Sequence, residues 1–241
     1  MVIANKIRDV LASTNQGVVL TITDFGIEPQ YQQALVMTLN RKIKHGELKR
    51  VSKGKYYKPK KTIFGTLPPD SDEITKDFLQ KGGVTIGYVT GARAFAQIGL
   101  TTQISSSMLV GTNKYRRPMQ RGDNKISFLL QPNKITDDVI PLLRILDAMR
   151  LIQEIPATTP EDCVRQIGKL IIALDPNQQQ KLVKLSLAYQ PNVRALTGAV
   201  LEQNGLCDLT EQLRLSLNGV TKYKLPISAT ALSTKKNWNI V

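Results

Sequence analysis

Residues 29–58 of the chain read PQYQQALVMTLNRKIKHGELKRVSKGKYYK, and this stretch decides the fold that the sequence predicts. Proline is common in the first turn of a helix and glycine just after the last turn, so Pro29 and Gly46 predict a long helix between them. Beyond this helix we expect strands at 48–51 and 56–58, joined by a short turn that contains a glycine. The stretch therefore predicts a helix followed by a β-hairpin.

The residues before this stretch add a shorter helix and a strand. Apolar residues recur at helical spacing around 5–12, which predicts a first helix. A short β-rich run at 18–20 follows, and Thr23 and Asp24 are typical N-caps for a brief helical turn. The order of helix, strand, short helix, long helix and hairpin is that of a winged helix-turn-helix, which we expect over 1–61.

Positive charge is concentrated in the same region. The chain carries 33 Lys and Arg against 19 Asp and Glu, a formal net charge of +14. The segment 41–61 contains ten basic residues and one acid, Glu47. So basic a balance favours polyanion partners, mainly nucleic acid. Charge runs are usually solvated faces or tails, but this one is interleaved with strand residues and follows a helix.

The long helix has two chemically different sides when its residues are placed about 100° apart. The apolar side consists of Leu35, Val36, Leu39 and Ile43. The opposite side carries Gln30, Gln33, Ala34, Met37, Arg41 and Lys44. Glutamine and arginine can each make paired hydrogen bonds to the edges of adenine and guanine in the major groove. The polar side is therefore the candidate recognition face, and we expect the apolar side to pack on the first helix.

Positions along this helix suggest different roles. Residues near the start of a recognition helix usually reach the bases, so Gln30 and Gln33 are the candidates for base contact. Arg41 and Lys44 lie further along and are expected nearer the phosphates, while Thr38 sits at the edge of the face. A glutamine-bearing helix face is, however, most often simply solvated.

The hairpin supplies the remaining candidate DNA contacts. Lys53 and Lys55 lie in or beside its turn and are expected to reach the DNA backbone or the minor groove. Lys49, Arg50 and Lys58 are expected to contact phosphates, which position a protein on DNA without reading its sequence. A winged helix can also be a protein-binding module that never meets DNA, but the charge of this segment favours DNA.

The rest of the chain, 62–241, is expected to form a second domain. Its expected parts are an α/β region at about 62–135, a helical region at about 136–219 and an extended tail at 220–241. Within the first of these we expect an extended connector at 64–69 and a turn at 122–124. The fold class is thus α+β, an N-terminal winged helix-turn-helix followed by a mixed α/β and then mainly helical C-terminal domain.

Few residues suggest an active site. His45 is the only histidine, and Cys163 and Cys207 are expected to be reduced, buried thiols. Asp137 and Asp138 are better explained as helix caps than as metal ligands. There is no zinc-binding cluster and no phosphate-binding glycine motif. We therefore expect no enzymatic activity, no catalytic residue, no cofactor and no metal.

The sequence also bears on cellular location. No run approaches the ~18 consecutive apolar residues of a membrane-spanning helix. The first residues lack the charged region and longer apolar stretch of a signal peptide. We therefore expect a cytoplasmic protein without a membrane partner.

The chain resembles the AbiE-type antitoxins of bacterial type IV toxin–antitoxin systems and related winged-helix proteins. The resemblance extends over nearly the full length of the chain. It rests on the combination of several stretches, since none of them is a sharp motif by itself. The stretches are LNRKIKHGELKR at 39–50, GKYYKP at 54–59, TGARA at 90–94, GLTTQ at 99–103, YKL at 223–225, IS at 227–228 and KNWNI at 236–240.

This resemblance implies a two-part protein. The winged helix would bind inverted repeats of duplex DNA upstream of its own operon and repress it, as a monomer or a homodimer on paired half-sites. The C-terminal domain would counter a nucleotidyltransferase-like toxin. Two alternatives stay open: a stand-alone transcriptional regulator whose C-terminal domain dimerises or senses a ligand, and a nucleic-acid-processing enzyme that uses the winged helix for docking.

Overall fold

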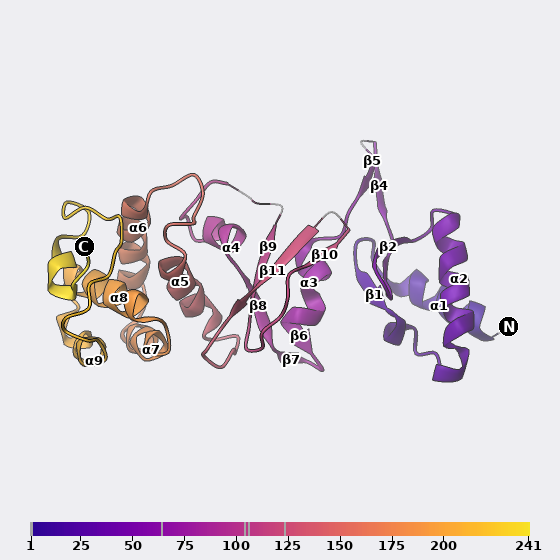
Figure 1. Ribbon diagram of the computed structural model, residues 1–241. Helices are drawn as coiled ribbons and strands as arrows, with labels where there is room; N and C mark the ends of the chain where they lie inside the picture. Colours follow the sequence, from indigo (N-terminus) through magenta and orange to yellow (C-terminus); the bar gives the residue numbers. More distant parts are fainter. Residues whose placement is uncertain (1, 64, 104, 106, 123) are drawn as a thin grey trace. The chain divides into compact units, whose positions relative to one another are not determined.

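The computed structural model has the element order shown in Figure 1. The residues that it describes are 2–63, 65–103, 105, 107–122 and 124–241. Phe64 of the expected connector and Asp123 of the expected turn lie outside them. The chain forms two compact units, the first unit (1–77 with 119–125) and the second unit (78–118 with 126–241). The expected 1–61 domain falls within the first unit.

The first unit contains short helices and strands in the expected order. Its elements are α1 (Val2–Ser13), β1 (Val19–Thr21), the 3₁₀ turns η1 (Ile22–Phe25) and η2 (Pro29–Tyr31), α2 (Gln32–Lys44), β2 (Lys49–Ser52), β3 (Lys55–Tyr57), β4 (Lys60–Thr62), β5 (Gly65–Leu67), most of α3 (Ser71–Leu79) and β10 (Met119–Arg121). Strands β1, β3 and β2 form an antiparallel sheet in that order. The turn between β2 and β3 passes through Gly54, whose φ of 74° favours glycine.

An apolar core holds together α1, β1, η1, α2 and β3. Its buried members are Ile7, Leu11, Leu20, Phe25, Leu35, Leu39, Leu48 and Tyr56. Leu35 and Leu39 stand one turn apart on α2, so the apolar side expected from the helical wheel faces this core. Ile43 packs against the core from a partly buried position. The opposite side of α2 is thereby left to solvent.

Three local expectations for this unit are corrected. The stretch expected to be an extended connector contributes strand β5, which pairs antiparallel with β4. The helix expected after Pro29 begins at Gln32, and Pro29 opens the separate turn η2. The N-cap of η1 is Thr21, whose backbone N–H donates to the Asp24 carboxylate at 2.6 Å. Asp24 is the N3 residue of this turn, and its side chain reaches back to the N-cap. The true N-cap therefore lies two to three residues before the expected ones.

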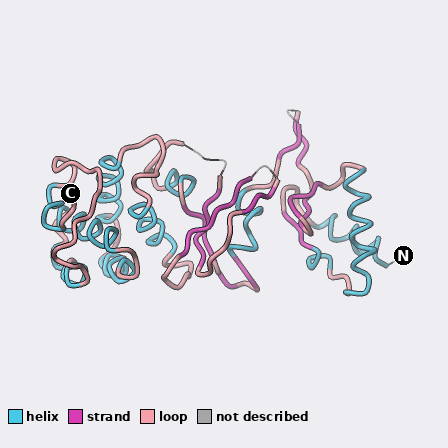
Figure 2. Tube along the Cα trace, viewed as in Figure 1, coloured by secondary structure: helices cyan, strands magenta, loops and turns pink. Residues whose placement is uncertain are grey.

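The second unit begins with strands and is mainly helical from α5 onward, as the helix and strand colours of Figure 2 show. Its elements are β6 (Gln80–Lys81), β7 (Val84–Thr85), β8 (Gly87–Thr90), α4 (Ala92–Gln97), β9 (Met108–Thr112), most of β11 (Asn124–Leu130), α5 (Ile140–Arg150), α6 (Pro160–Ile172), α7 (Pro176–Ser186), α8 (Pro191–Gln203), η3 (Cys207–Leu209), α9 (Glu211–Leu215) and η4 (Ser233–Trp238). Strand β9 runs parallel to β11 and antiparallel to β8. The protein is thus a mixed α+β chain with a mainly helical C-terminal region.

Helix α8 lies at the centre of the helical part. Val193 and the whole run 195–201 are buried. At Gly198 a Cβ would lie 2.2 Å from the Trp238 ring, so only glycine lets η4 approach so closely. The tail from 220 onward is draped on the unit as expected, with Tyr223 and Ile240 joined by a β-bridge.

The caps expected at Asp137 and Asp138 do not form, because α5 begins at Ile140 and its N-cap, Val139, makes no side-chain hydrogen bond. Two later helices of this unit do begin at side-chain caps. The Thr159 side chain accepts a hydrogen bond from the Asp162 backbone N–H at 3.1 Å at the start of α6. Asp175 does the same for Gln178 at 2.9 Å at the start of α7. Both cysteines are free, but only Cys163 is buried, whereas Cys207 is exposed.

Candidate nucleic-acid interface

The polar face of α2 is the best-formed candidate surface in the first unit. Gln33, Arg41 and Lys44 are exposed on it, and Met37 between them keeps 62% of its surface accessible. Within the described residues, Gln33 and Arg41 have no internal hydrogen-bond partner. The helical spacing therefore brings these side chains to one face, free to meet a ligand.

Two other predicted residues of this face have neighbours that limit them. Gln30 lies on η2, before α2 begins, and its amide donates to the Glu28 carboxylate at 2.8 Å. The Thr38 hydroxyl donates to the Ala34 carbonyl oxygen at 2.9 Å, one turn back on the helix. Each bond occupies one donor, which leaves Gln30 its second N–H and its carbonyl oxygen and leaves Thr38 its hydroxyl oxygen as an acceptor.

Three cations of the hairpin are exposed. Lys49 and Arg50 lie on β2, and Lys53 lies in the turn that joins β2 to β3. The Arg50 Nε donates to the Ser52 carbonyl oxygen at 3.1 Å, which leaves its terminal nitrogens available. The acid of this segment is already neutralised, since Glu47 pairs with Lys42 at 2.6 Å and this bond lowers the pKa of Glu47. The hairpin therefore presents positive charge without a competing free carboxylate.

The structure gives the other two hairpin lysines internal partners. Lys55 is paired with Asp77 at 2.5 Å, and its side chain keeps only 15% of its surface. Lys58 donates to the carbonyl oxygens of Leu11 at 2.9 Å and Thr14 at 3.2 Å, at the C-terminal end of α1. A cation there satisfies carbonyl groups that the helix leaves unpaired and interacts favourably with its dipole. These two lysines stabilise the fold, so the candidate interface rests on the other eight residues.

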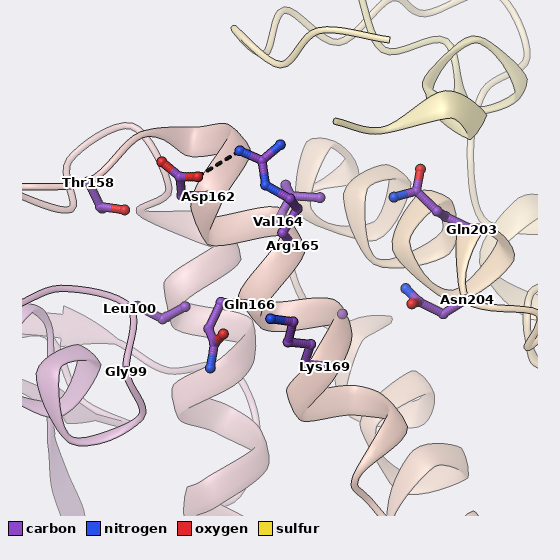
Figure 3. Close-up of a pocket in the computed structure, with 11 residues that line it drawn as sticks. Gly99, Leu100, Thr158, Asp162, Val164, Arg165, Gln166, Lys169, Gln203 and Asn204 are labelled. Carbon is purple, nitrogen blue, oxygen red and sulfur yellow. Dashed lines mark hydrogen bonds and ion pairs between the residues drawn. The ribbon is translucent and has the colours of Figure 1, made fainter. Parts of the chain in front are cut away.

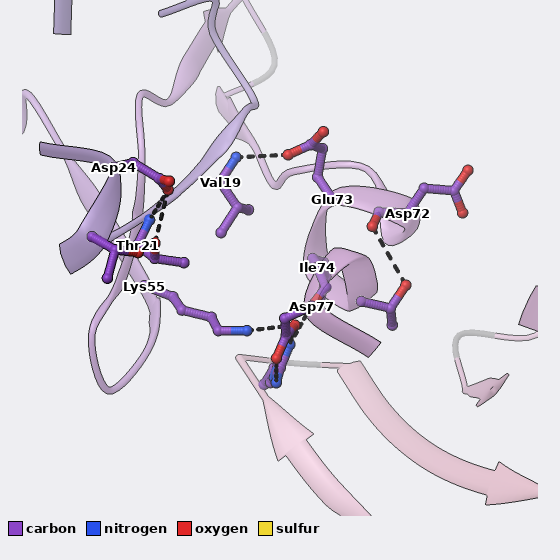
Figure 4. A network of polar contacts seen from close by, with 11 residues as sticks. Val19, Thr21, Asp24, Lys55, Asp72, Glu73, Ile74 and Asp77 are labelled. Atoms are coloured by element: carbon purple, nitrogen blue, oxygen red, sulfur yellow. Dashed lines mark hydrogen bonds and ion pairs between the residues drawn. The ribbon is translucent and has the colours of Figure 1, made fainter. Parts of the chain in front are cut away.

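Asp77 is the centre of a polar network that the sequence did not reveal (Figure 4). Besides Lys55 it binds Arg121, whose two terminal nitrogens donate to its two oxygens at 2.6 and 2.8 Å. Burial by itself raises the pKa of Asp77, but the hydrogen bonds from Arg121 and Lys55 outweigh it and lower the pKa. On the same helix, Glu73 accepts the Val19 backbone N–H at 3.0 Å. The network joins α3 to the sheet that carries the basic hairpin.

A cavity of about 480 Å³ in the second unit has a mixed polar and apolar lining (Figure 3). It lies between α6 and α8, and Asp162 is the acid that lines it. That carboxylate is already bound to Arg165 at 2.6 Å and to the Thr159 hydroxyl at 2.7 Å. An acid with both oxygens occupied is poorly placed to act as a general base.

The described part of the chain offers neither a metal-binding cluster nor a membrane-spanning helix. Among those residues no three His, Cys, Asp or Glu side chains lie close enough together to hold a metal ion. No helix there is long and apolar enough to cross a membrane.

Comparisons with known proteins give a family and a fold. A family model described as "Family of unknown function (DUF6088)" matches residues 6–154. No curated protein matches the chain. A solved structure, the Rv2827c protein from Mycobacterium tuberculosis, is similar over 92% of this chain and 84% of its own, with a TM-score of 0.51 and 14% identity. An identity this low supports a shared fold alone. Because the family model covers more than half of the sequence, the chain belongs to the DUF6088 family.

Proposed function

We propose that residues 1–61 form a winged helix-turn-helix that binds duplex DNA, and that the protein represses its own operon. The observation that carries this proposal is the exposed polar face of α2, with the exposed cations of the β2–β3 hairpin in the same unit. In this arrangement α2 is the recognition helix and the hairpin is the wing. The element order and the buried apolar side of α2 support it.

Each exposed side chain then has a role that follows from its chemistry. Gln33, in the first turn of α2, presents the amide that pairs with adenine in the major groove. Met37 offers an adaptable apolar contact suited to a thymine methyl group. Arg41 and Lys44 near the end of α2, and Lys53 at the wing, neutralise phosphates. Gln30 would contact a base through its carbonyl oxygen and its second amide N–H, since one N–H is bound to Glu28.

We further propose that the second unit counters a nucleotidyltransferase-like toxin encoded beside this gene. The resemblance to AbiE-type antitoxins supports this half. It predicts that expression of the neighbouring gene alone slows growth and that co-expression of this protein restores it. Rescue by a variant that no longer binds DNA would place the antitoxin activity in the second unit, and absence of any rescue would leave a stand-alone regulator.

The DNA half is tested by binding to the region upstream of the gene, titrated against salt and compared with random duplex. Sequence-selective binding is expected, with affinity falling as salt rises because condensed counterions are released. Gln33→Ala should cost about 1–3 kcal/mol on the preferred site and relax its specificity. Gln180→Ala, the same change at an exposed position of α7, is the matched control and should bind like the parent protein. If the parent protein and both variants bind all duplexes with similar affinity, the polar face of α2 is not a recognition face.

A further inference from the structure

A second cavity in the second unit is lined by an unusual number of cations. It measures about 560 Å³, within the range of small-molecule sites. Lys81, Lys114, Arg116 and Lys134 line it, against one acid, Asp137. Its lining also includes apolar side chains, Val84, Ile86 and Ile135. A hollow with a cationic lining and apolar patches suits a small anion that carries an apolar body.

The loops that carry two of these lysines are held together by one side chain. The Asn113 amide donates to the carbonyl oxygens of Gln131 at 2.8 Å and Asn133 at 2.6 Å. This fixes the residue before Lys114 to the residue before Lys134, although 20 positions of sequence separate them. The fold therefore brings the two lysines to the lining of the same cavity.

The one acid of the cavity does little to offset these charges. An oxygen of Asp137 accepts a hydrogen bond from the Thr85 hydroxyl at 2.7 Å, which ties β7 to the segment before α5. One carboxylate faces four cations, so the cavity keeps an excess of positive charge. An anionic ligand would remove that excess.

Arg116 is the most constrained of the four cations. Its guanidinium carbon lies 5.1 Å from the centre of the Phe78 ring and 5.9 Å from that of Phe128, at cation–π distance. Its Nε is buried, and among the described residues it has no hydrogen-bond partner. A buried donor without a partner is rare in folded proteins and marks a missing acceptor. A guanidinium held on two rings is oriented in advance to bind a phosphate with two parallel hydrogen bonds.

We infer that this cavity binds a small phosphate monoester whose body offers a flat, weakly polar face, such as the base of a nucleoside monophosphate. Arg116 supplies the paired hydrogen bonds, Lys114 and Lys134 balance the phosphate charge, and the apolar residues contact the body of the ligand. The site belongs to the second unit and does not depend on the DNA-binding function proposed for the first unit.

Isothermal titration of the full chain tests the site with three probes, adenosine monophosphate, inorganic phosphate and adenosine. We expect saturable one-to-one binding of the monophosphate, weaker binding of phosphate and no binding of adenosine. Arg116→Lys keeps the charge but loses the paired hydrogen bonds, and should weaken binding of the monophosphate about tenfold. If neither phosphate-bearing probe binds at millimolar concentration, the inference is overturned.

A second pair of variants guards against loss of folding in the Arg116 variant. Lys114→Gln with Lys134→Gln changes two exposed side chains and should also weaken binding about tenfold. Lys184→Gln with Lys222→Gln makes the same change of charge at exposed positions outside the cavity and should leave binding unchanged. If both pairs of variants lose the same affinity for the monophosphate, the effect comes from net charge alone, and the proposed site is overturned. Displacement of the monophosphate by a short DNA duplex would assign these cations to a nucleic-acid backbone, which also overturns it.

Discussion

Each unit of the protein has an aspartate at the centre of a polar network, and the two networks use opposite chemistry. Asp77 in the first unit keeps 38% of its side-chain surface and is bound by two cations, Lys55 and Arg121. Asp147 in the second unit is fully buried and is bound by neutral hydroxyl groups. The hydroxyls of Tyr88 and Thr90 donate to one of its oxygens at 2.6 and 2.9 Å.

Two further neutral side chains take part in the second network. Tyr189 donates to the other oxygen of Asp147 at 2.9 Å. The Gln131 amide donates to both tyrosine hydroxyls, at 2.8 Å to Tyr88 and 2.7 Å to Tyr189. A buried carboxyl can thus be satisfied without a counter-ion, provided that enough donors converge on it.

The two environments move the two pKa values in opposite directions. Burial raises the pKa of Asp147, and the hydrogen bonds from Tyr88, Tyr189 and Thr90 only partly oppose it. Burial also raises the pKa of Asp77, but there the two cations reverse the shift. The depth of burial and the charge of the donors together decide the sign, because Asp147 is fully buried among neutral hydroxyls whereas Asp77 is partly exposed beside two cations.

The largest expected effect comes from breaking the buried network. Asp147→Ala leaves three buried hydroxyl groups without their acceptor and should lower the free energy of unfolding by about 3–5 kcal/mol. Fluorescence of Trp238, the only tryptophan, follows denaturation of the second unit specifically. Asp208→Ala, at an exposed position of the same unit, is the control and should cost less than about 0.5 kcal/mol. Similar losses in the two variants would mean that the network contributes no stability.

The opposite pKa shifts predict opposite pH dependence in the two units. Asp147 binds its proton more tightly when folded, so its contribution to stability is present below the unfolded pKa and is lost as pH rises through the raised pKa. Asp147→Asn, which cannot titrate, should flatten this dependence when Trp238 fluorescence is followed between acid and neutral pH. An unchanged profile would show that Asp147 does not titrate differently in the folded state.

Asp77 should show the reverse behaviour with a smaller amplitude. Its lowered pKa means that its contribution is present above the unfolded pKa and is lost as pH falls through the folded pKa. Because more than a third of its side chain is exposed, solvent screening limits the cost of Asp77→Asn to about 1 kcal/mol. Hydrogen exchange of backbone amides in the first unit measures it. High salt should reduce the loss of stability caused by Asp77→Asn, because salt screens exposed charges, and should not change the loss caused by Asp147→Asn.

The contrast between local and distant interactions explains what the sequence could predict. The apolar side of α2 and the caps at Thr159 and Asp175 were predictable because the residues involved lie within one or two helical turns. The β4–β5 hairpin was missed, since Lys60 and Lys61 have the composition of a solvated tail and its strands are three residues long. Short strands with polar side chains leave no alternating pattern to detect.

The two networks were invisible to the sequence for a different reason. Arg121 is 44 positions from Asp77, and Tyr88 is 59 positions from Asp147. No local pattern relates residues so far apart, and an isolated aspartate in a helical segment is typical of a solvated surface. The candidate DNA face was predictable only in part, for the same reason. The sequence predicts that Gln33 is exposed, but no local pattern indicates that Lys55 pairs with Asp77.

The smallest expected effect compares two lysines that the sequence treats alike. Lys53 is exposed in the hairpin turn, whereas Lys55 is held by Asp77. Lys53→Ala should weaken binding to all duplexes about equally and lower the slope of log affinity against log salt by about one, since one phosphate contact is lost. Lys55→Ala should leave that slope unchanged and instead speed hydrogen exchange in the first unit, because Asp77 loses a partner. If Lys55→Ala lowers the slope as much as Lys53→Ala, then Lys55 leaves Asp77 for the DNA, and the ion network of the first unit is broken when DNA binds.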